Sequence, residues 1–467
     1  MKGLNYKGEW WLPDEPKIKK KGTLTFDKRD GGKLKIFESF TGKPSMFSNP
    51  DYDIVLGNTL SGKHITLYNC RFSDSTISSA GPYAGSFDVE KIHSGWHFPD
   101  KDEIKFHRTE FYFPNFENWV NISGFSTCRD GEDISIDYEQ PETINTNIRN
   151  HNVKIEFKLP KPLGISTKCN LEQKTFIAIE SEDLTHIQEH LKLGHLIRNF
   201  LTLAMDQTTF PKKIVSSSEV YMKELNEDRK RPAKIYTYHV DGPGKNRDFP
   251  REKLNRSQML FSYEEISENF EKYLNNWLYI NEKFEHLLTN YFGVIYSPNR
   301  HLQNDFLRFV RGLESYHRSS NREGIYQNKE EYLDGLYSEM VNVIPDELDS
   351  NFKDSLKSRL KHHYEHSLRK RFQSLFDELS EILSPIAPDD GQFVDTVIEA
   401  RNFLIHYSED SKDKIQNWDD LREDLYYSIQ KLRLIVEAIL LHEMEIPDPQ
   451  IKEIVTSTFR YERYCES

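Results

Sequence analysis

The hydrophobic pattern changes once along the 467-residue chain, and this change constrains the fold more than any other feature of the sequence. Up to about residue 180, short runs of β-branched and aromatic residues alternate with turn residues, as in Gly22–Phe26, His64–Tyr68 and Val153–Phe157, which is typical of antiparallel β structure. Beyond about residue 262, apolar residues recur at helical spacing. We therefore predict an α+β multidomain chain, with an N-terminal antiparallel β-rich domain followed by an all-α helical bundle.

The change in pattern also sets the expected domain boundaries. The β-rich domain is predicted over residues 1–255 and includes one helix at about 184–205. A helical connector over 256–300 leads into the C-terminal domain at 301–467. A loop is expected at 241–247. The main helices of the C-terminal domain are predicted at residues 308–316, 354–383, 393–406 and 418–444.

Two local signals mark a turn and a helix start. Asp30-Gly31-Gly32 lies between two β-type runs and predicts a hairpin turn. Ser262 is followed three residues later by Glu265, which is the spacing of a capping box. We expect the helix that begins there to reach about Phe292.

Composition argues against several classes of protein. No apolar run approaches the roughly 18 residues needed to cross a bilayer, and the first residues do not resemble an export signal. We therefore expect a cytoplasmic protein with no membrane partner. The four cysteines are widely separated and form no CxxC pair, which favours reduced thiols. Two H-x-x-E-H patterns, at 186–190 and 362–366, resemble zinc-protease motifs but have no evident third ligand, so we expect no metal and no other cofactor.

An arginine interrupts the apolar stripe of the helix predicted at 393–406. Helical geometry places Arg401 inside the apolar stripe, an arc of about 140° occupied by Phe393, Val394, Val397, Ile398, Leu404 and Ile405. A guanidinium in such a place needs a polar partner, a subunit interface or an anionic ligand. His406 and Asn402 lie on an adjacent sector. Arginine binds phosphate and histidine transfers protons near neutral pH, so the pair predicts phosphodiester chemistry without metal. The alternative is an interface arginine paired with a glutamate and a histidine that merely ends a helix.

A basic run is the second candidate site. Residues 353–371 contain seven lysines and arginines against Asp354 and Glu365, in a chain whose formal net charge is -13. Such a run neutralises phosphates and predicts an RNA-binding face. The alternative is a solvated helix face balanced by a neighbouring acidic loop. The candidate RNA-binding residues are Lys357, Arg359, Lys361, Arg369, Lys370 and Arg371.

Other polar and aromatic patterns favour structural roles. Arg198-Asn199 imitates the start of the 401–406 motif, but Leu203 stands where histidine would be needed, so we interpret the segment as core helix. His317 and Arg318 either approach the site or cap the end of their helix. The tryptophans before residue 120 form either a ligand-binding surface or, as we prefer, core.

Five segments resemble a known family. The run Glu399–Tyr407 resembles the R-N-x3-H signature of HEPN domains (higher eukaryotes and prokaryotes nucleotide-binding). The run Phe306–Arg318 is similar to the first core helix of the ApeA-like HEPN group. The segments Gly8–Pro13, Gly22–Leu24 and Ile65–Leu67 are similar to the β domain that precedes HEPN in ApeA-type anti-phage proteins.

The resemblance implies an activity and a set of partners. It implies a homodimer or higher even oligomer in which two copies of Arg401 and His406 form one cleft, with Asn402 orienting the phosphate or the histidine. The implied function is metal-independent endoribonuclease action in abortive infection, with transfer RNA as one target and products ending in 2′,3′-cyclic phosphate and 5′-hydroxyl. The N-terminal domain would sense a phage-derived trigger. Ser408 stands where HEPN toxins controlled by adenylylation carry tyrosine, which argues against that control.

A second function remains open on the sequence. A catalytically silent HEPN protein that binds RNA or nucleotide and signals by oligomerisation would share both the helical fold and the basic run. The two functions differ in whether RNA acquires 5′-hydroxyl ends that depend on His406.

Overall fold

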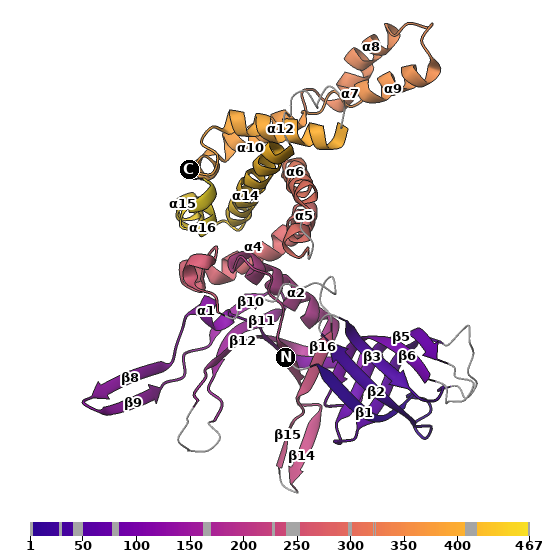
Figure 1. Cartoon of the computed structure of the whole chain (residues 1–467), viewed down its shortest axis with the longest axis vertical. Coiled ribbons are helices and arrows are strands. Elements are labelled where there is room, and N and C mark those ends of the chain that lie inside the picture. Colours follow the sequence, from indigo (N-terminus) through magenta and orange to yellow (C-terminus); the bar gives the residue numbers. More distant parts are fainter. Residues whose placement is uncertain are drawn as a thin grey trace. The chain divides into compact units, whose positions relative to one another are not determined.

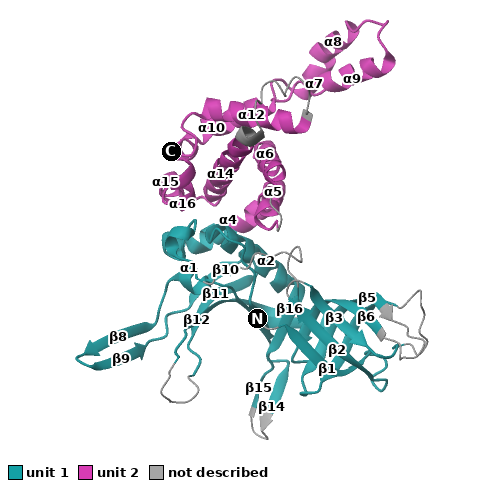
Figure 2. Ribbon diagram, viewed as in Figure 1, with its two compact units in different colours: residues 1–275 teal, residues 276–467 magenta. Residues whose placement is uncertain are grey.

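The computed structural model of the chain describes residues 3–27, 30–40, 50–76, 84–161, 170–226, 229–239, 253–297, 301–320, 322, 324–406 and 418–465. They belong to two compact units, Met1–Asn275 and Asn276–Ser467 (Figure 2). The division lies inside helix α4 (Phe270–Lys283), beyond the boundary at 255 that the sequence indicated. The loop expected at 241–247 lies outside the described residues.

The first unit contains one large antiparallel sheet. Within the described residues twelve strands pair in the order β10-β11-β12-β7-β13-β16-β6-β3-β2-β1-β4-β5. Figure 1 labels most of these strands. These strands are β1 (Leu4–Trp11), β2 (Lys20–Asp27), β3 (Gly31–Ile36), β4 (Tyr52–Thr59), β5 (His64–Thr76), β6 (Ala84–Ser94), β7 (Lys105–Tyr112), β10 (Ile144–Ile148), β11 (His151–Lys158), β12 (Lys174–His186), β13 (Lys213–Ser217) and β16 (Ile235–His239). The hairpin predicted at Asp30-Gly31-Gly32 is confirmed in its pairing, since β2 and β3 are antiparallel with Asp27 opposite Gly31, but Gly31 and Gly32 already belong to β3.

Strand β6 divides this sheet into a barrel and an open part. One edge of β6 pairs with β5, while its other edge pairs first with β3 and then with β16. The strands from β6 to β5 therefore close into a barrel. Its interior is apolar, and Trp10, Leu24, Val55 and Ile65 are almost fully buried there. Gly57 lets the Trp10 ring lie against the backbone of β4, because a Cβ at this glycine would lie 2.2 Å from the ring.

The open part of the sheet is covered on one face by helix α2 (Ile187–Ala204). Gly194 allows the close approach, since a Cβ there would lie 2.5 Å from the ring of Phe111 on β7. The helix begins three residues later than predicted from the sequence. Strand β12 continues to His186, whose Nδ1 then caps α2 by accepting a hydrogen bond of 3.2 Å from the backbone N of Gln188.

Contacts of Trp119 explain why the first unit reaches residue 275. Trp119 lies in the short helix α1 (Phe116–Val120), and its Nε1 donates to the carbonyl O of Phe261 at 3.0 Å. Its ring packs against Tyr263 and Phe270. The segment that follows residue 255 is therefore part of this core. It begins with η2 (Arg256–Gln258), α3 (Tyr263–Ile266) and η3 (Ser267–Asn269).

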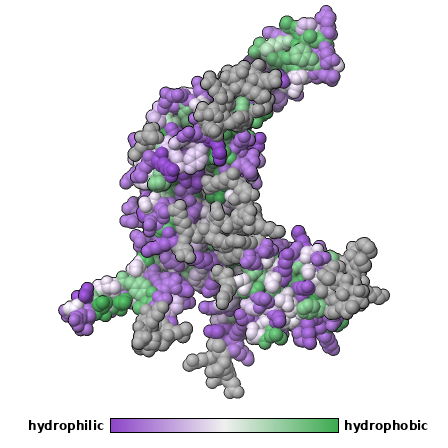
Figure 3. All heavy atoms as spheres, viewed as in Figure 1, coloured by the Kyte–Doolittle hydropathy of each residue, from purple (hydrophilic) through white to green (hydrophobic). Residues whose placement is uncertain are grey.

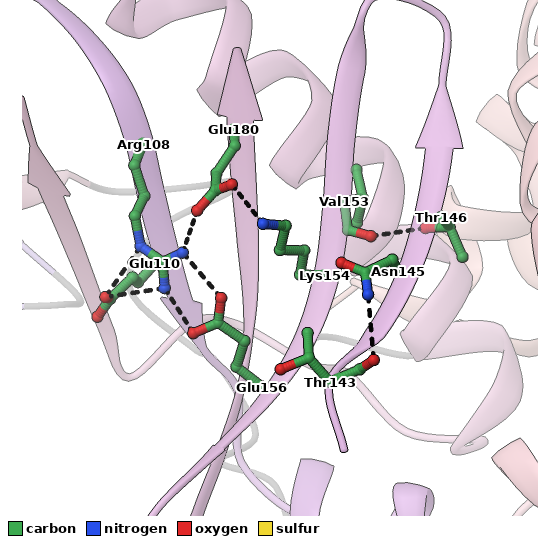
Figure 4. A network of polar contacts seen from close by, with 9 residues as sticks. All are labelled: Arg108, Glu110, Thr143, Asn145, Thr146, Val153, Lys154, Glu156 and Glu180. Atoms are coloured by element: carbon green, nitrogen blue, oxygen red, sulfur yellow. Dashed lines mark hydrogen bonds and ion pairs between the residues drawn. The ribbon is translucent and has the colours of Figure 1, made fainter. Parts of the chain in front are cut away.

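The opposite face of the open sheet carries a polar network (Figure 4). Arg108 donates to both carboxylate oxygens of Glu156 at 2.8 Å and also pairs with Glu110 and Glu180. Lys154 reaches the second oxygen of Glu180 at 2.7 Å. Burial alone would lower the pKa of Arg108, but the hydrogen bonds to Glu156 and Glu180 raise it. The network thus links β7, β11 and β12 on this face.

Two hairpins project from the first unit. One is β8 (Phe125–Asp130) with β9 (Asp133–Tyr138), and the other is β14 (Met222–Asn226) with β15 (Arg229–Pro232). Ile134 and Ile136 are exposed on the first hairpin, where Figure 3 shows apolar surface. The remaining short helix of this unit is η1 (Lys101–Glu103).

The second unit is a helical bundle. Its bundle helices are α5 (Glu285–Ile295), α6 (Leu302–Ser319), α10 (Leu368–Glu378), α11 (Ser380–Leu383), α12 (Asp390–His406), α14 (Trp418–Glu443), α15 (Asp448–Thr456) and α16 (Phe459–Tyr464). Every residue from Leu434 to Leu441 is buried, which identifies α14 as the central helix. Within the described residues no helix combines the length and apolarity needed to cross a bilayer.

Two predicted long helices are interrupted in the structure. The capping box at Ser262 and Glu265 is confirmed, but the helix it opens ends at Ile266 and helical structure breaks again at Phe284, between α4 and α5. The helix predicted at 354–383 is divided into three. The first break covers residues 361–367, where the backbone N of Tyr326 donates to the carbonyl O of Tyr364 at 2.7 Å. The second break is at Leu379, whose backbone leaves helical geometry.

The first break forms the base of a helical arm, which we define as residues 325–366. It contains α7 (Lys329–Tyr332), η4 (Leu333–Tyr337), α8 (Ser338–Asn342) and α9 (Ser350–Leu360). Figure 1 shows these helices standing apart from the bundle. Leu336, Val343 and Phe352 are exposed on the arm. Figure 3 shows apolar surface there.

Candidate functional site

The first half of α12 packs into the bundle and the second half emerges from it. Val394, Val397 and Ile398 are buried, as the apolar stripe predicts. In the last turns the same face is open, since Leu404 is only half-buried and Ile405 keeps 41% of its surface exposed. Phe403, outside the predicted stripe, is buried instead. The stripe thus holds for one half of the helix, and its second half presents apolar side chains at the surface.

Arg401 lies where α12 emerges. Its side chain is half-buried, and its Nη1 donates to Oδ1 of the exposed Asn402 at 2.9 Å. No carboxylate pairs with Arg401 within the part of the chain that the structure describes. A guanidinium has five N–H donors, so this contact leaves donors for an anion. The bond holds Arg401 against Asn402, and the role of Asn402 toward the phosphate or the histidine, which the family resemblance implies, is still a prediction.

His406 is the last residue of α12. Its backbone is helical, but its side chain lies outside the described residues, as do Tyr407 and Ser408. The predicted convergence of its imidazole with Arg401 is therefore still a prediction.

A polar connection joins the arm to the bundle, and we call it the neck. It consists of Gly324 to Tyr326, Tyr364 to His366, and Arg371 of α10. Arg371 is 3% exposed, and its Nη2 and Nε donate to the carbonyl oxygens of Gly324 and His366, each at 3.1 Å. Its Nη1 lies 3.2 Å from Nδ1 of His317. Burial, followed by the charge of Arg371, lowers the pKa of His317 to about 4. His317 is therefore neutral, and with Arg371 it supports the neck.

The candidate RNA-binding residues occupy different environments. Arg371 is buried, so we remove it from the candidate RNA contacts. Arg369 pairs with Asp395 of α12. Lys357 is half-buried on α9, and Arg359 on the same helix is exposed. Lys361 and Lys370 are also exposed. The sequence indicated one continuous basic helix, but the structure divides it between the arm, the neck and α10.

The remaining sequence patterns have structural roles. His190 is buried, and its two ring nitrogens hydrogen-bond to Thr109 and Ser181 at 2.8 and 2.9 Å. Arg198 and Asn199 are buried in α2, as predicted. The prediction that the early tryptophans are core is confirmed for Trp10, Trp11 and Trp119, while Trp96 is half-buried.

The exposed ring of Tyr326 could not have been anticipated from the sequence. It keeps 62% of its surface exposed and lies against the ring of His366 with centroids 4.5 Å apart. The two residues meet only because the neck pairs segments about forty residues apart. No local motif near Tyr326 carries that information.

Comparison with known protein families agrees with this architecture. The family model described as ApeA N-terminal domain 1 matches residues 5–277, and the model described as Apea-like HEPN matches residues 307–450. No curated protein and no solved structure shows significant similarity to the chain. The first family model alone spans more than half of the chain, and the second contains both the arm and α12. The chain therefore belongs to the ApeA family, with an N-terminal β-rich domain followed by an ApeA-like HEPN domain.

Proposed function

We propose that this protein is a metal-independent endoribonuclease that acts in anti-phage defence by abortive infection. The family supports an RNA-related, defence-type role. The observation that carries the finer proposal is Arg401, a half-buried guanidinium bound by Asn402 and by no carboxylate among the described residues. An anionic phosphodiester would supply the missing charge.

The proposed reaction is attack by the 2′-hydroxyl of RNA on the adjacent phosphorus. His406 would transfer a proton, either from the attacking hydroxyl or to the departing 5′ oxygen. Arg401 would bind the phosphate oxygens, on which negative charge grows in the transition state. The products would be a 2′,3′-cyclic phosphate and a 5′-hydroxyl. Transfer RNA is a suitable target, because breaking an essential RNA stops growth.

We further propose that the open half of α12 is a contact between two copies of the chain. Ile405 is exposed and Leu404 half-exposed beside Arg401, although both are apolar. A second copy would cover them and bring two sets of Arg401 and His406 together. This arrangement would also desolvate the guanidinium, which strengthens its interaction with phosphate.

The test is cleavage of total cellular RNA by purified protein in the presence of EDTA, with a phage lysate as activator. We expect cleavage to persist without metal and to fall by about 100-fold or more in Arg401→Ala and His406→Ala. Gln392→Ala, at the exposed start of α12, is the matched control and should cleave as wild type. A strict metal requirement, or full activity of either site variant, would contradict the proposal.

A further inference from the structure

The seven basic residues of 353–371 separate into matched and unmatched charges. Three have acidic partners: Lys353 with Asp346, Arg369 with Asp395 and Arg371 with Glu365. The other four form no ion pair among the described residues; they are Lys357, Arg359, Lys361 and Lys370. The unmatched group is thus confined to the end of α9, its C-cap residue and the start of α10.

Helix stability explains only part of this group. Lys357 and Arg359 lie in the last turn of α9, where positive charge stabilises the helix dipole. Lys361 lies past that helix, in the C-cap position. Lys370 lies in the first turn of α10, which has no acidic residue. Positive charge is unfavourable at a helix N-terminus, whereas an anion is favourable there.

An exposed aromatic ring accompanies these charges. Tyr326 belongs to the neck, and its ring lies against His366. His362 and His363 are exposed beside Lys361. Proteins bind single-stranded nucleic acid with positive side chains along its phosphate backbone and with exposed aromatic rings on which its bases stack.

The start of α10 and the end of α12 lie at the same edge of the bundle. The rings of Phe376 and Phe393 are 6.1 Å apart, while Arg369, two turns earlier on α10, pairs with Asp395. The two helices therefore run in opposite directions. Arg401 lies six residues past Asp395, about 9 Å along the helix axis, in the direction of the neck. A strand bound at the start of α10 would thus lie at the edge of the bundle from which Arg401 emerges.

We propose that Lys357, Arg359, Lys361, Lys370 and Tyr326 bind a single-stranded segment of RNA that flanks the cleaved bond. This inference rests on the proposed function only for the identity of that RNA as substrate. The cations would contact successive phosphates and Tyr326 would stack on one base. RNA with an unpaired stretch beside the cleaved bond would then be preferred over a short oligonucleotide that cannot reach the arm.

Counterion release sets the size of the expected effect. Each phosphate contact on a single strand contributes about 0.7 to the dependence of log K on log salt concentration. Loss of three contacts should therefore reduce that slope by about 2 and weaken binding about 100-fold at roughly 0.1 M salt. Loss of one stacked base weakens binding by roughly 5-fold to 150-fold.

The experiment measures binding of a fluorescein-labelled 20-nucleotide uridine RNA to the full chain, in an Arg401→Ala background that prevents cleavage. The test variants are the triple Lys357→Gln, Arg359→Gln, Lys361→Gln and the single Tyr326→Ala. Lys353→Gln is the matched control, because it removes a lysine of α9 already paired with Asp346. We expect about 100-fold weaker binding for the triple variant, at least 5-fold for Tyr326→Ala, and less than 2-fold for the control. Circular dichroism checks that each variant keeps its helices.

Binding by both test variants within 2-fold of the background, or equal losses in Lys353→Gln, would overturn the inference. The same would follow if a 20-base-pair DNA duplex bound tightly with the same dependence on these residues. If the triple variant failed to fold, loss of binding in Tyr326→Ala would still support the proposed RNA contact at the neck. The binding assay needs no catalysis. Absence of RNA cleavage by wild-type protein would therefore refute the proposed function but would not decide whether these residues bind RNA.

Discussion

Glu437 offers a direct test of how the helical bundle is held together. Its side chain on α14 is 1% exposed. One carboxylate oxygen accepts hydrogen bonds from Tyr291 Oη at 2.9 Å and Arg433 Nε at 2.8 Å. The other accepts from Arg460 Nη1 at 2.7 Å. This carboxylate therefore links α14 to α5 and α16.

Glu437→Ala removes the acceptor for all three donors and leaves two nearly buried guanidiniums without this carboxylate. Breaking a buried pair by removing one partner costs about 3–5 kcal/mol. A unit the size of residues 276–467 loses roughly 2–4 °C of melting temperature per kcal/mol. The helical transition should therefore fall by about 6–20 °C. Glu437→Gln keeps the shape and one acceptor oxygen, so we expect about half that loss.

The assay is thermal unfolding of the full chain, followed by the helical circular dichroism signal. Glu423→Ala is the matched control, because Glu423 is an exposed glutamate on the same helix and such substitutions change stability by about 0.5 kcal/mol or less. If Glu437→Ala melted within about 2 °C of wild type, the carboxylate would not stabilise the bundle in the way these contacts indicate.

Two further predictions concern the sheet and the open half of α12. Burial by itself would raise the pKa of Glu180, but hydrogen bonds from Lys154 and Arg108 lower this pKa overall. The stability that the ionised Glu180 contributes is therefore present above the ordinary carboxyl pKa and is lost as the pH falls through the lowered pKa. Arg108→Met should therefore cost about 2–3 kcal/mol at pH 7.5, where three carboxylates then face one another, and clearly less below the ordinary carboxyl pKa, at about pH 3.5, in urea unfolding; an equal loss at both pH values would be inconsistent with the network of Figure 4. Ile405→Asp should halve the mass measured by light scattering and abolish cleavage, with Thr396→Asp as control; an unchanged mass would place the contact between copies elsewhere.

Periodicity was sufficient to predict the fold class and several of its elements. Alternation in the N-terminal half located strands such as β2 and β11, and the capping box at Ser262 and Glu265 located the start of α3. These signals are local, so the sequence carries them directly. The boundary at 255 differs from the structural one because the burial of Phe270 against Trp119 is a long-range contact. The helical pattern that begins near residue 260 looks the same as that of the bundle, so it does not show that this segment packs on the β-rich domain.

The candidate site shows the same division between local and long-range information. The motif placed Arg401 and Asn402 on one helix, because spacing within a helix fixes relative position. The basic run was predicted as a single helix, since nothing in it signals that Tyr364 bonds to Tyr326. Arg371 is buried beside that long-range pairing, whereas the adjacent residue Lys370 is exposed. Counting charges therefore identified the basic run at 353–371 but could not separate the cations that have structural partners from those without an acidic partner.

The central claim is that Arg401 and His406 cleave RNA through its own 2′-hydroxyl. The most direct measurement is the chemistry of RNA ends after incubation with activated protein in EDTA, with Arg401→Ala and His406→Ala as controls. We predict 5′-hydroxyl and 2′,3′-cyclic phosphate ends that appear with wild-type protein and are absent with both variants. Ends bearing 5′-phosphate, or the same ends from the His406→Ala protein, would contradict it.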